Sequence, residues 1–275
     1  MPSPFRLLVI GAHPDDCEYT CGGTAALWSA AGHVIKFVSV TDGRSGHHQV
    51  EPEVLVSIRA QEAVEAAKVL GVESEILRFP DGSLQPGLEL RDEIIRIVRE
   101  FRADIVITHR PNDYHPDHRY TSQAVQDSAF MVTVPHVCPE VEALKRNPVI
   151  FYLADRFQKP CPFSADAIVP IDAVMETKID SLACHASQVY EWLPHVDGRE
   201  AAPLDPVERR SFLATWVSRP SRDLARRHAP SMVKAFGLEA SARIENIEAY
   251  EACEYGGALP AEAFGCLFGH DPLTP

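Results

Sequence analysis

RLLVIGAHPDD, at residues 6–16, is the stretch that decides the fold class. Its first half is a continuous apolar run, typical of a strand buried on both faces of a parallel sheet, and its second half is polar. The same alternation of apolar runs and helical periodicity returns along the chain. The expected strands are 6–11, 33–41, 75–79 and 104–109, and the expected helices are about 23–31, 57–71 and 88–102. This βαβ order predicts an α/β fold with a Rossmann-like doubly wound, mainly parallel sheet of order 3-2-1-4-5.

The second half of the chain is less regular. Helices are expected near 117–130 and over 174–187, and strands over 149–154 and 167–171. Beyond about residue 190, prolines divide the chain into short pieces, and the apolar pattern is too interrupted for a separate core. We therefore expect a single domain over residues 1–275, in which residues 190–275 form an irregular C-terminal cover and not an independent domain.

Composition restricts the class of protein. A hydrophobic content of 45% and a charged content of 24% are ordinary for a globular protein, and no run approaches the roughly 18 apolar residues that cross a bilayer. The N-terminal residues lack a secretory signal pattern, and seven cysteines without a CxxC pair suit reduced thiols, so we expect a cytoplasmic protein. A net charge of −13 opposes nucleic acid, and we expect neither nucleic acid nor membrane as a partner. A homo-oligomer stays open.

The loop after the first strand is suited to a cation. GAHPDD has one glycine where a dinucleotide-binding GxGxxG loop has three, and two adjacent carboxylates would repel a phosphate. His13 offers an imidazole, and Asp15 and Asp16 offer anionic oxygens. A structural alternative is that Asp16 only caps the following helix, since aspartate is a preferred capping residue.

A second polar segment, HRPNDYHPDHR at 109–119, follows the fourth strand and repeats the letters HPD. In the predicted order strands 1 and 4 are neighbours, and ligands bind in the crevice beyond their carboxyl ends. His13 and Asp16 with a histidine from the second segment would supply three protein ligands and leave one position for water, as in catalytic zinc sites.

The chain resembles the PIG-L/LmbE family of zinc-dependent N-acetylglucosaminyl deacetylases over roughly residues 5–190. The resemblance rests on AHPDD, GGT at 22–24, TDG at 41–43, PNDYHPDHR at 111–119 and HASQ at 185–188. It implies zinc ligation by His13, Asp16 and His118, with Asp15 as general base. It also implies that His115, oriented by Asp117, steadies the oxyanion or protonates the leaving amine. The family more commonly has glutamate directly after AHPDD, where this chain has Cys17 followed by Glu18.

The RAQE segment at 59–62 resembles an Arg-xx-Glu element that lies near the substrate in relatives, so Arg59 is a candidate substrate contact. The sequence thus predicts a zinc-dependent hydrolase that removes an N-acetyl group from an N-acetylglucosamine-containing or related small, linear amide; another divalent metal such as iron stays open. One alternative is a non-catalytic, metal-stabilised sugar-binding protein. Another is a non-haem iron oxygenase using two histidines and a carboxylate, although such enzymes are usually jelly rolls.

Overall fold

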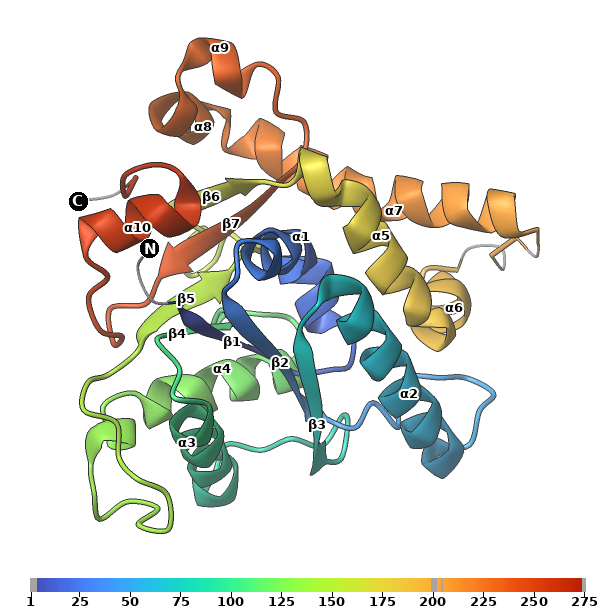
Figure 1. Ribbon diagram of the computed structural model, residues 1–275. Coiled ribbons are helices and arrows are strands. Elements are labelled where there is room, and N and C mark those ends of the chain that lie inside the picture. The colour runs from blue at the N-terminus through green and yellow to red at the C-terminus, as the bar shows by residue number, and fades with distance from the viewer. Residues whose placement is uncertain (1–3, 199–201, 204, 274–275) are drawn as a thin grey trace.

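The structure, a computed structural model, describes residues 4–198, 202–203 and 205–273. Within these residues the strands form one seven-stranded sheet of order β3-β2-β1-β4-β5-β7-β6, with helices on both faces (Figure 1). The strands are β1 (Arg6–Gly11), β2 (Val34–Thr41), β3 (Glu73–Phe79), β4 (Ile105–Thr108), β5 (Val149–Leu153), β6 (Ala167–Pro170) and β7 (Ile247–Ala252). The five neighbouring strands β3, β2, β1, β4 and β5 pair in parallel, which confirms the predicted order 3-2-1-4-5. Strand β7 is antiparallel to β5 and β6.

Helices enclose the sheet on both sides because its central strand is apolar on both. Successive side chains of a strand point to opposite faces. Leu7 and Val9 of β1 lie in one core with α1, α5, α7 and α10, and Leu8 and Ile10 lie in a second core with α3 and α4. The α-helices are α1 (Asp16–Ala30), α2 (Pro52–Leu70), α3 (Leu88–Phe101), α4 (Pro116–Ser128), α5 (Met175–Cys184), α6 (Leu193–Val196), α7 (Pro206–Arg227), α8 (Ala229–Phe236), α9 (Leu238–Ser241) and α10 (Ala261–Phe268). Short 3-10 helices span Met131–Thr133 and Asp172–Val174, and a π-helix spans Ser187–Trp192.

Helix α1 begins seven residues before the position expected from the sequence, at Asp16 and not near Gly23. Gly23 permits close packing of the helix against Ile171, because a Cβ at Gly23 would lie 2.8 Å from Cβ of Ile171. The carboxylate of Glu248, on β7, accepts the backbone N–H groups of Gly23 at 3.0 Å and Thr24 at 2.7 Å. The candidate metal ligands of the first loop therefore lie at the start of a helix that Glu248 of β7 holds in place.

The expectation of an irregular segment over 190–275 is wrong for most of the described residues. Helix α7 is 22 residues long and extends past the edge of the sheet (Figure 1). It starts with Pro206 at its first position, where proline is favoured, and the side chain of Asp205 accepts the N–H of Val207 at 2.9 Å. Strand β7 lies inside the main sheet. No described helix is both long and apolar enough to span a bilayer.

Candidate metal and catalytic site

The two histidine-containing loops meet at one edge of the sheet. Ile10 of β1 pairs in parallel with Thr108 of β4, so the segments that follow both strands leave from the same edge. His13 lies in the first segment and His118 in the first turn of α4, and His13 Nδ1 is 3.3 Å from His118 Nε2. The expected convergence of the two loops is therefore observed.

Three side-chain atoms form a compact triangle at this point. Asp16 Oδ2 lies 3.3 Å from His13 Nδ1 and 3.5 Å from His118 Nε2, and the two nitrogens are 3.3 Å apart. Ligand atoms about 2.0–2.1 Å from a tetrahedral zinc ion are themselves about 3.3–3.4 Å apart, so the triangle has the size of one face of such a site. Two imidazoles and a carboxylate are also donors that suit a divalent transition metal. An ion on these three atoms would keep a fourth position for water or substrate.

Carboxylates contact both imidazoles at the nitrogen that faces away from the triangle. His13 Nε2 lies 3.1 Å from Asp81 Oδ1 and 3.4 Å from Asp117 Oδ2, and His118 Nδ1 lies 3.1 Å from Asp113 Oδ2. Protons on these outer nitrogens leave the lone pairs on the inner nitrogens, as metal-binding histidines require. Burial disfavours a charged imidazole, but the surrounding carboxylates outweigh it and raise the pKa of His13 well above its usual value.

Asp117 contacts His115 through its backbone and not through its carboxylate. His115 Nδ1 accepts the backbone N–H of Asp117 at 3.2 Å. This happens because His115 is the N-cap of α4, where a side chain turns back onto the free amides of the first turn. The Asp117 carboxylate accepts the N–H groups of Gly82 at 2.7 Å and Leu84 at 3.3 Å and contacts His13.

His115 lies beside the triangle with one nitrogen directed away from its own helix. Its ring is edge-on to His13 at 4.6 Å, and the candidate ligand atoms of His13, His115 and His118 all lie within 4.8 Å of one another. Burial and the positive charge of the neighbouring imidazoles lower the pKa of His115. In the neutral form with Nδ1 as acceptor, the proton is on Nε2, so His115 can donate a hydrogen bond.

Asp15 has a strained backbone and a buried side chain. Its φ is 119°, in the region that favours glycine, and its side chain does not cap α1. Burial and the neighbouring charge of Asp16 raise the pKa of Asp15 to about 7. Strained conformations of this kind persist where the surrounding structure enforces them, frequently at active sites. A carboxyl group with a pKa near neutrality can exchange a proton at physiological pH.

Arg59, the predicted substrate contact, is buried among protein partners. Its side chain is 1% exposed, and Nη2 donates to the carbonyl of Gly46 at 2.7 Å and to the side-chain oxygen of Gln188. Gly43 permits this close approach, because a Cβ there would lie 2.7 Å from Arg59 Cδ. The structure thus uses Arg59 to join the loop after β2 to the π-helix, and direct substrate contact stays a prediction.

The HASQ and RAQE segments contact each other behind Asp15. The carboxylate of Glu62 accepts from the backbone N–H of Ser187 at 2.7 Å and from its hydroxyl at 2.6 Å. His185 is fully buried, and its Nε2 lies 3.3 Å from Glu18 Oε1. The two segments therefore place buried charged side chains next to Asp15 of the candidate site.

Three residues of the site were missed by the sequence reasoning: Asp81, His109 and Asp113. His109 stacks on His118 with ring centroids 4.0 Å apart and planes 7° apart, and its Nε2 accepts the backbone N–H of Ala12 at 3.0 Å. His109 and Asp113 belong to the polar segment 109–119, so its full composition was the available signal. Asp81 follows β3, which is not a neighbour of β4, and its approach depends on how the loop after β3 folds back.

Three other groups among the described residues could hold an ion. Asp16 with His109 and His118 would use His109 Nε2, which already accepts a backbone N–H. His13 with Asp81 and Asp117 would use His13 Nε2, the nitrogen that faces two carboxylates. His13 with His115 and His118 would hold the ion without a carboxylate. The triangle formed by His13 Nδ1, Asp16 Oδ2 and His118 Nε2 needs neither His109 Nε2 nor His13 Nε2 and contains a carboxylate, so it is the better candidate.

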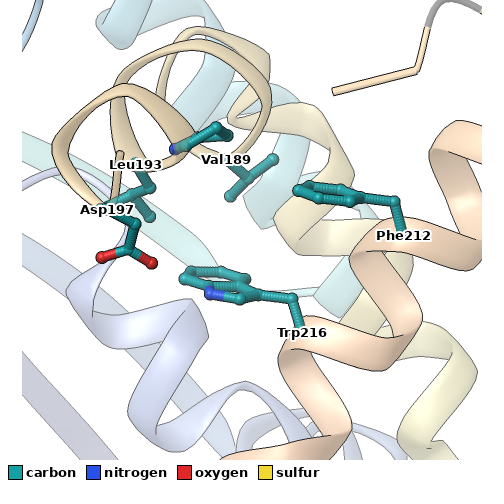
Figure 2. A pocket seen from close by; sticks show the side chains of 6 residues that line it. Val189, Leu193, Asp197, Phe212 and Trp216 are labelled. Carbon is teal, nitrogen blue, oxygen red and sulfur yellow. The ribbon is translucent and has the colours of Figure 1, made fainter. Parts of the chain in front are cut away.

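A hollow lies between helix α7 and the segment around the π-helix, next to Tyr19 of α1. It is lined by Val189, Leu193, Pro194, Asp197, Phe212 and Trp216. Figure 2 shows the rings of Phe212 and Trp216 extending from α7 toward Val189 and Leu193. The Trp216 ring also contacts Tyr19, with centroids 5.3 Å apart. Burial raises the pKa of Tyr19 and the charge of Asp15 contributes to the increase, so the hollow lies near the candidate site.

Comparison with known sequences gives one family. Residues 8–129 match the family model described as PIG-L: GlcNAc-PI de-N-acetylase. The diacetylchitobiose deacetylase of Thermococcus kodakarensis is 29% identical over 207 residues, which cover 70% of this chain and 74% of that protein.

Two solved structures share the fold. The N,N'-diacetylchitobiose deacetylase from Pyrococcus horikoshii matches with a TM-score of 0.70 and 22% identity, over 90% of this chain and 84% of that one. The 4-carboxy-2-hydroxymuconate hydratase from Pseudomonas putida matches with a TM-score of 0.72 and 17% identity, over 92% and 98%. At these identities the matches speak for the fold alone.

Proposed function

We propose, from the premise that residues 8–129 form a PIG-L family domain, that this protein is a zinc-dependent hydrolase. Its reaction is removal of an N-acetyl group from a small molecule that contains N-acetylglucosamine or a related linear amide. The observation that carries the proposal is the triangle of His13, Asp16 and His118, whose three atoms are 3.3–3.5 Å apart beside Asp15 and His115. The relatedness to diacetylchitobiose deacetylase supports the reaction class.

Zinc held by His13, Asp16 and His118 would supply a water of pKa about 7 and polarise the amide carbonyl. Asp15 accepts the proton of the attacking water, since its pKa of about 7 lets the carboxylate take up a proton and release it near neutral pH. The backbone of Asp15 is held in a strained, positive-φ conformation at the start of α1, next to Asp16, whose carboxylate faces the triangle.

His115 acts on the other side of the reacting carbonyl. Its neutral ring donates a hydrogen bond from Nε2 to the oxyanion that develops as water attacks. The proton that Asp15 took from the water then passes to the departing amine. The Asp117 backbone fixes this tautomer of His115 by donating to Nδ1. Asp81 and the Asp117 carboxylate contact the outer nitrogen of His13, and Asp113 contacts that of His118, which keeps both ligand histidines in place.

The experiment is a deacetylation assay with purified, zinc-loaded protein. The panel contains N,N'-diacetylchitobiose and glycosides of N-acetylglucosamine, and the product is detected as free primary amine. We expect amine from at least one member, loss of activity with a chelator, and recovery with zinc. Absence of amine from every member, with zinc shown to be bound, would refute the proposal.

The same assay separates the other reactions. A hydratase would consume an unsaturated tricarboxylate such as 4-carboxy-2-hydroxymuconate, seen as loss of its ultraviolet absorbance, and the shared fold of the Pseudomonas putida hydratase makes this the second reaction to measure. An iron oxygenase would need molecular oxygen, whereas the hydrolase works anaerobically. A sugar-binding protein would bind the glycosides without releasing amine. The deacetylase relatives favour hydrolysis over all three.

A further inference from the structure

The segment after β5 places an exposed arginine, Arg156, at the rim of the crevice. Strand β5 is parallel to β4, so residues 154–158 leave the sheet at the same edge as the metal-site loops. Asp155 fixes the start of this segment, because its carboxylate pairs with Arg110 at 3.2 Å and accepts the N–H of Phe157 at 2.9 Å. Arg156 is therefore held between two fixed neighbours.

Phe157 joins this segment to the site. Its ring contacts that of Tyr114, with centroids 6.2 Å apart, and Tyr114 in turn is edge-on to His115 at 5.7 Å and to His118 at 6.1 Å. Tyr114 is 72% exposed, so its ring covers the catalytic histidines at the surface. Arg156, next to Phe157 and itself exposed, lies on the rim that a substrate's second moiety would cross.

Arg156 differs from the buried arginines around the crevice because, in the described part of the chain, its exposed side chain has no hydrogen-bond or ion-pair partner. Arg110 pairs with Asp155 and Glu251, and Arg59 donates to Gly46 and Gln188. Within the residues that the structure describes, no carboxylate lies within ion-pairing distance of Arg156.

The charge of Arg156 also reaches the tyrosines around the site. Burial raises the pKa of Tyr19 to about 12, while the positive charge of Arg156 opposes the increase. Tyr114 shows the same opposition: burial and Asp113 raise its pKa, and His13 and Arg156 lower it. The guanidinium is thus electrostatically close to both walls of the crevice.

We propose that Arg156 binds an anionic group, a carboxylate or a phosphate, on the part of the substrate attached to the acetylated sugar. This inference rests on the proposed deacetylase function and assigns its substrate class. The crevice contains five aspartates, namely Asp15, Asp16, Asp81, Asp113 and Asp117, so an anionic substrate would be repelled unless a local cation compensated. The planar guanidinium of arginine matches carboxylate and phosphate oxygens with two parallel hydrogen bonds.

The test compares two nearly isosteric glycosides of N-acetylglucosamine, the carboxymethyl and the carbamoylmethyl, which differ in one charge. Zinc-loaded wild type should prefer the carboxylate, and Arg156→Gln should lower kcat/KM for it about 10- to 100-fold, the cost of a charged hydrogen bond. Activity on the carbamoylmethyl glycoside should stay within about twofold. Arg156→Lys should restore part of the loss, because it keeps the charge without the fork. The same comparison of wild type and Arg156→Gln with N-acetylglucosamine 1-phosphate tests whether the bound anion can be a phosphate.

Arg146→Gln is the matched control, because Arg146 precedes β5 at the opposite end of the same strand and its side chain is 83% exposed. This variant should leave kcat/KM unchanged for both substrates. Equal effects of Arg156→Gln on charged and neutral substrates would overturn the inference. If the wild type hydrolyses none of them, the proposed function fails separately. Binding of the carboxymethyl glycoside to zinc-loaded Asp15→Asn and Asp15→Asn/Arg156→Gln, measured by calorimetry, then still decides the role of Arg156.

Discussion

The metal-site triangle and Arg99 both bury charge, and they do so in opposite ways. Arg99, on α3, is 2% exposed, and each of its side-chain nitrogens donates to backbone carbonyls. The six acceptors belong to residues Met131, Val132, Val134, Val137, Cys138 and Val141. Every donor of this guanidinium is used, so the charge ties an irregular segment to the fold and has nothing left to offer a ligand.

In the triangle the acceptor atoms face one another. His13 Nδ1, Asp16 Oδ2 and His118 Nε2 share one small space, while carboxylates occupy the outer nitrogens of both histidines. Such a cluster of lone pairs is stable when a cation sits among them. Burial of charge alone therefore does not mark a functional site, whereas the convergence of three candidate ligand atoms does.

The largest expected effect is that of His13→Ala, which removes one corner of the triangle. We expect loss of bound zinc and of all measurable deacetylation, because two ligands rarely retain the ion. Metal content by mass spectrometry and the amine assay measure both. Arg99→Met should retain stoichiometric zinc as the control. Full zinc occupancy in His13→Ala would show that His13 is not a required zinc ligand.

Asp15→Asn should have the next largest effect, on turnover alone. It removes the proton acceptor without touching the triangle, so kcat should fall about 10²- to 10⁴-fold while zinc content is unchanged. Steady-state kinetics with parallel metal analysis test this. A loss of zinc equal to that of His13→Ala would show that Asp15 is a ligand and not the base.

Arg99→Met should affect stability and not chemistry. Removing the guanidinium leaves several buried carbonyls unpaired, which should lower the free energy of unfolding by about 3–5 kcal/mol. Urea unfolding of the zinc-loaded protein measures this change. The kcat/KM of the folded variant should equal that of wild type. Unchanged stability, or a loss of activity in fully folded protein, would contradict a purely structural role.

Asp81→Asn should have the smallest of these effects. Its carboxylate contacts the outer nitrogen of His13 at 3.1 Å, and loss of such a partner typically weakens metal affinity about 10- to 100-fold. Competition with a chelator gives the affinity. Asp127→Asn, an exposed change on α4, is the control and should leave zinc affinity unchanged. Equal zinc affinities of wild type, Asp81→Asn and Asp127→Asn would show that Asp81 does not support the metal site.

The sequence predicted the parts of the site that follow from neighbouring strands. Once β1 and β4 are adjacent, His13 and His118 must face the same crevice, and both lie in short polar segments that stand out from the apolar strands. Asp81 could not be found this way, because it reaches His13 only when the loop after β3 folds back. The hydrogen bond from the Gly82 N–H to Asp117 shows that fold, and no local pattern encodes it.

The C-terminal segment was mispredicted because its local signals conflict with its tertiary contacts. Strand β7 contains Glu248, a residue that disfavours a buried strand, yet Lys178 pairs with it at 2.6 Å and two amides of α1 bind it. Helix α7 contains Pro220, which reads as a helix breaker but is tolerated in the interior of this helix. Both errors concern elements whose stability depends on partners distant in sequence.

The most direct test is the crystal structure of the zinc-loaded protein with anomalous data at the zinc edge. The account predicts one ion, about 2.0–2.2 Å from His13 Nδ1, Asp16 Oδ2 and His118 Nε2, with a water at the fourth position. An ion bound instead by His13 Nε2, Asp81 and Asp117, or one closed off by a fourth protein ligand, would contradict it.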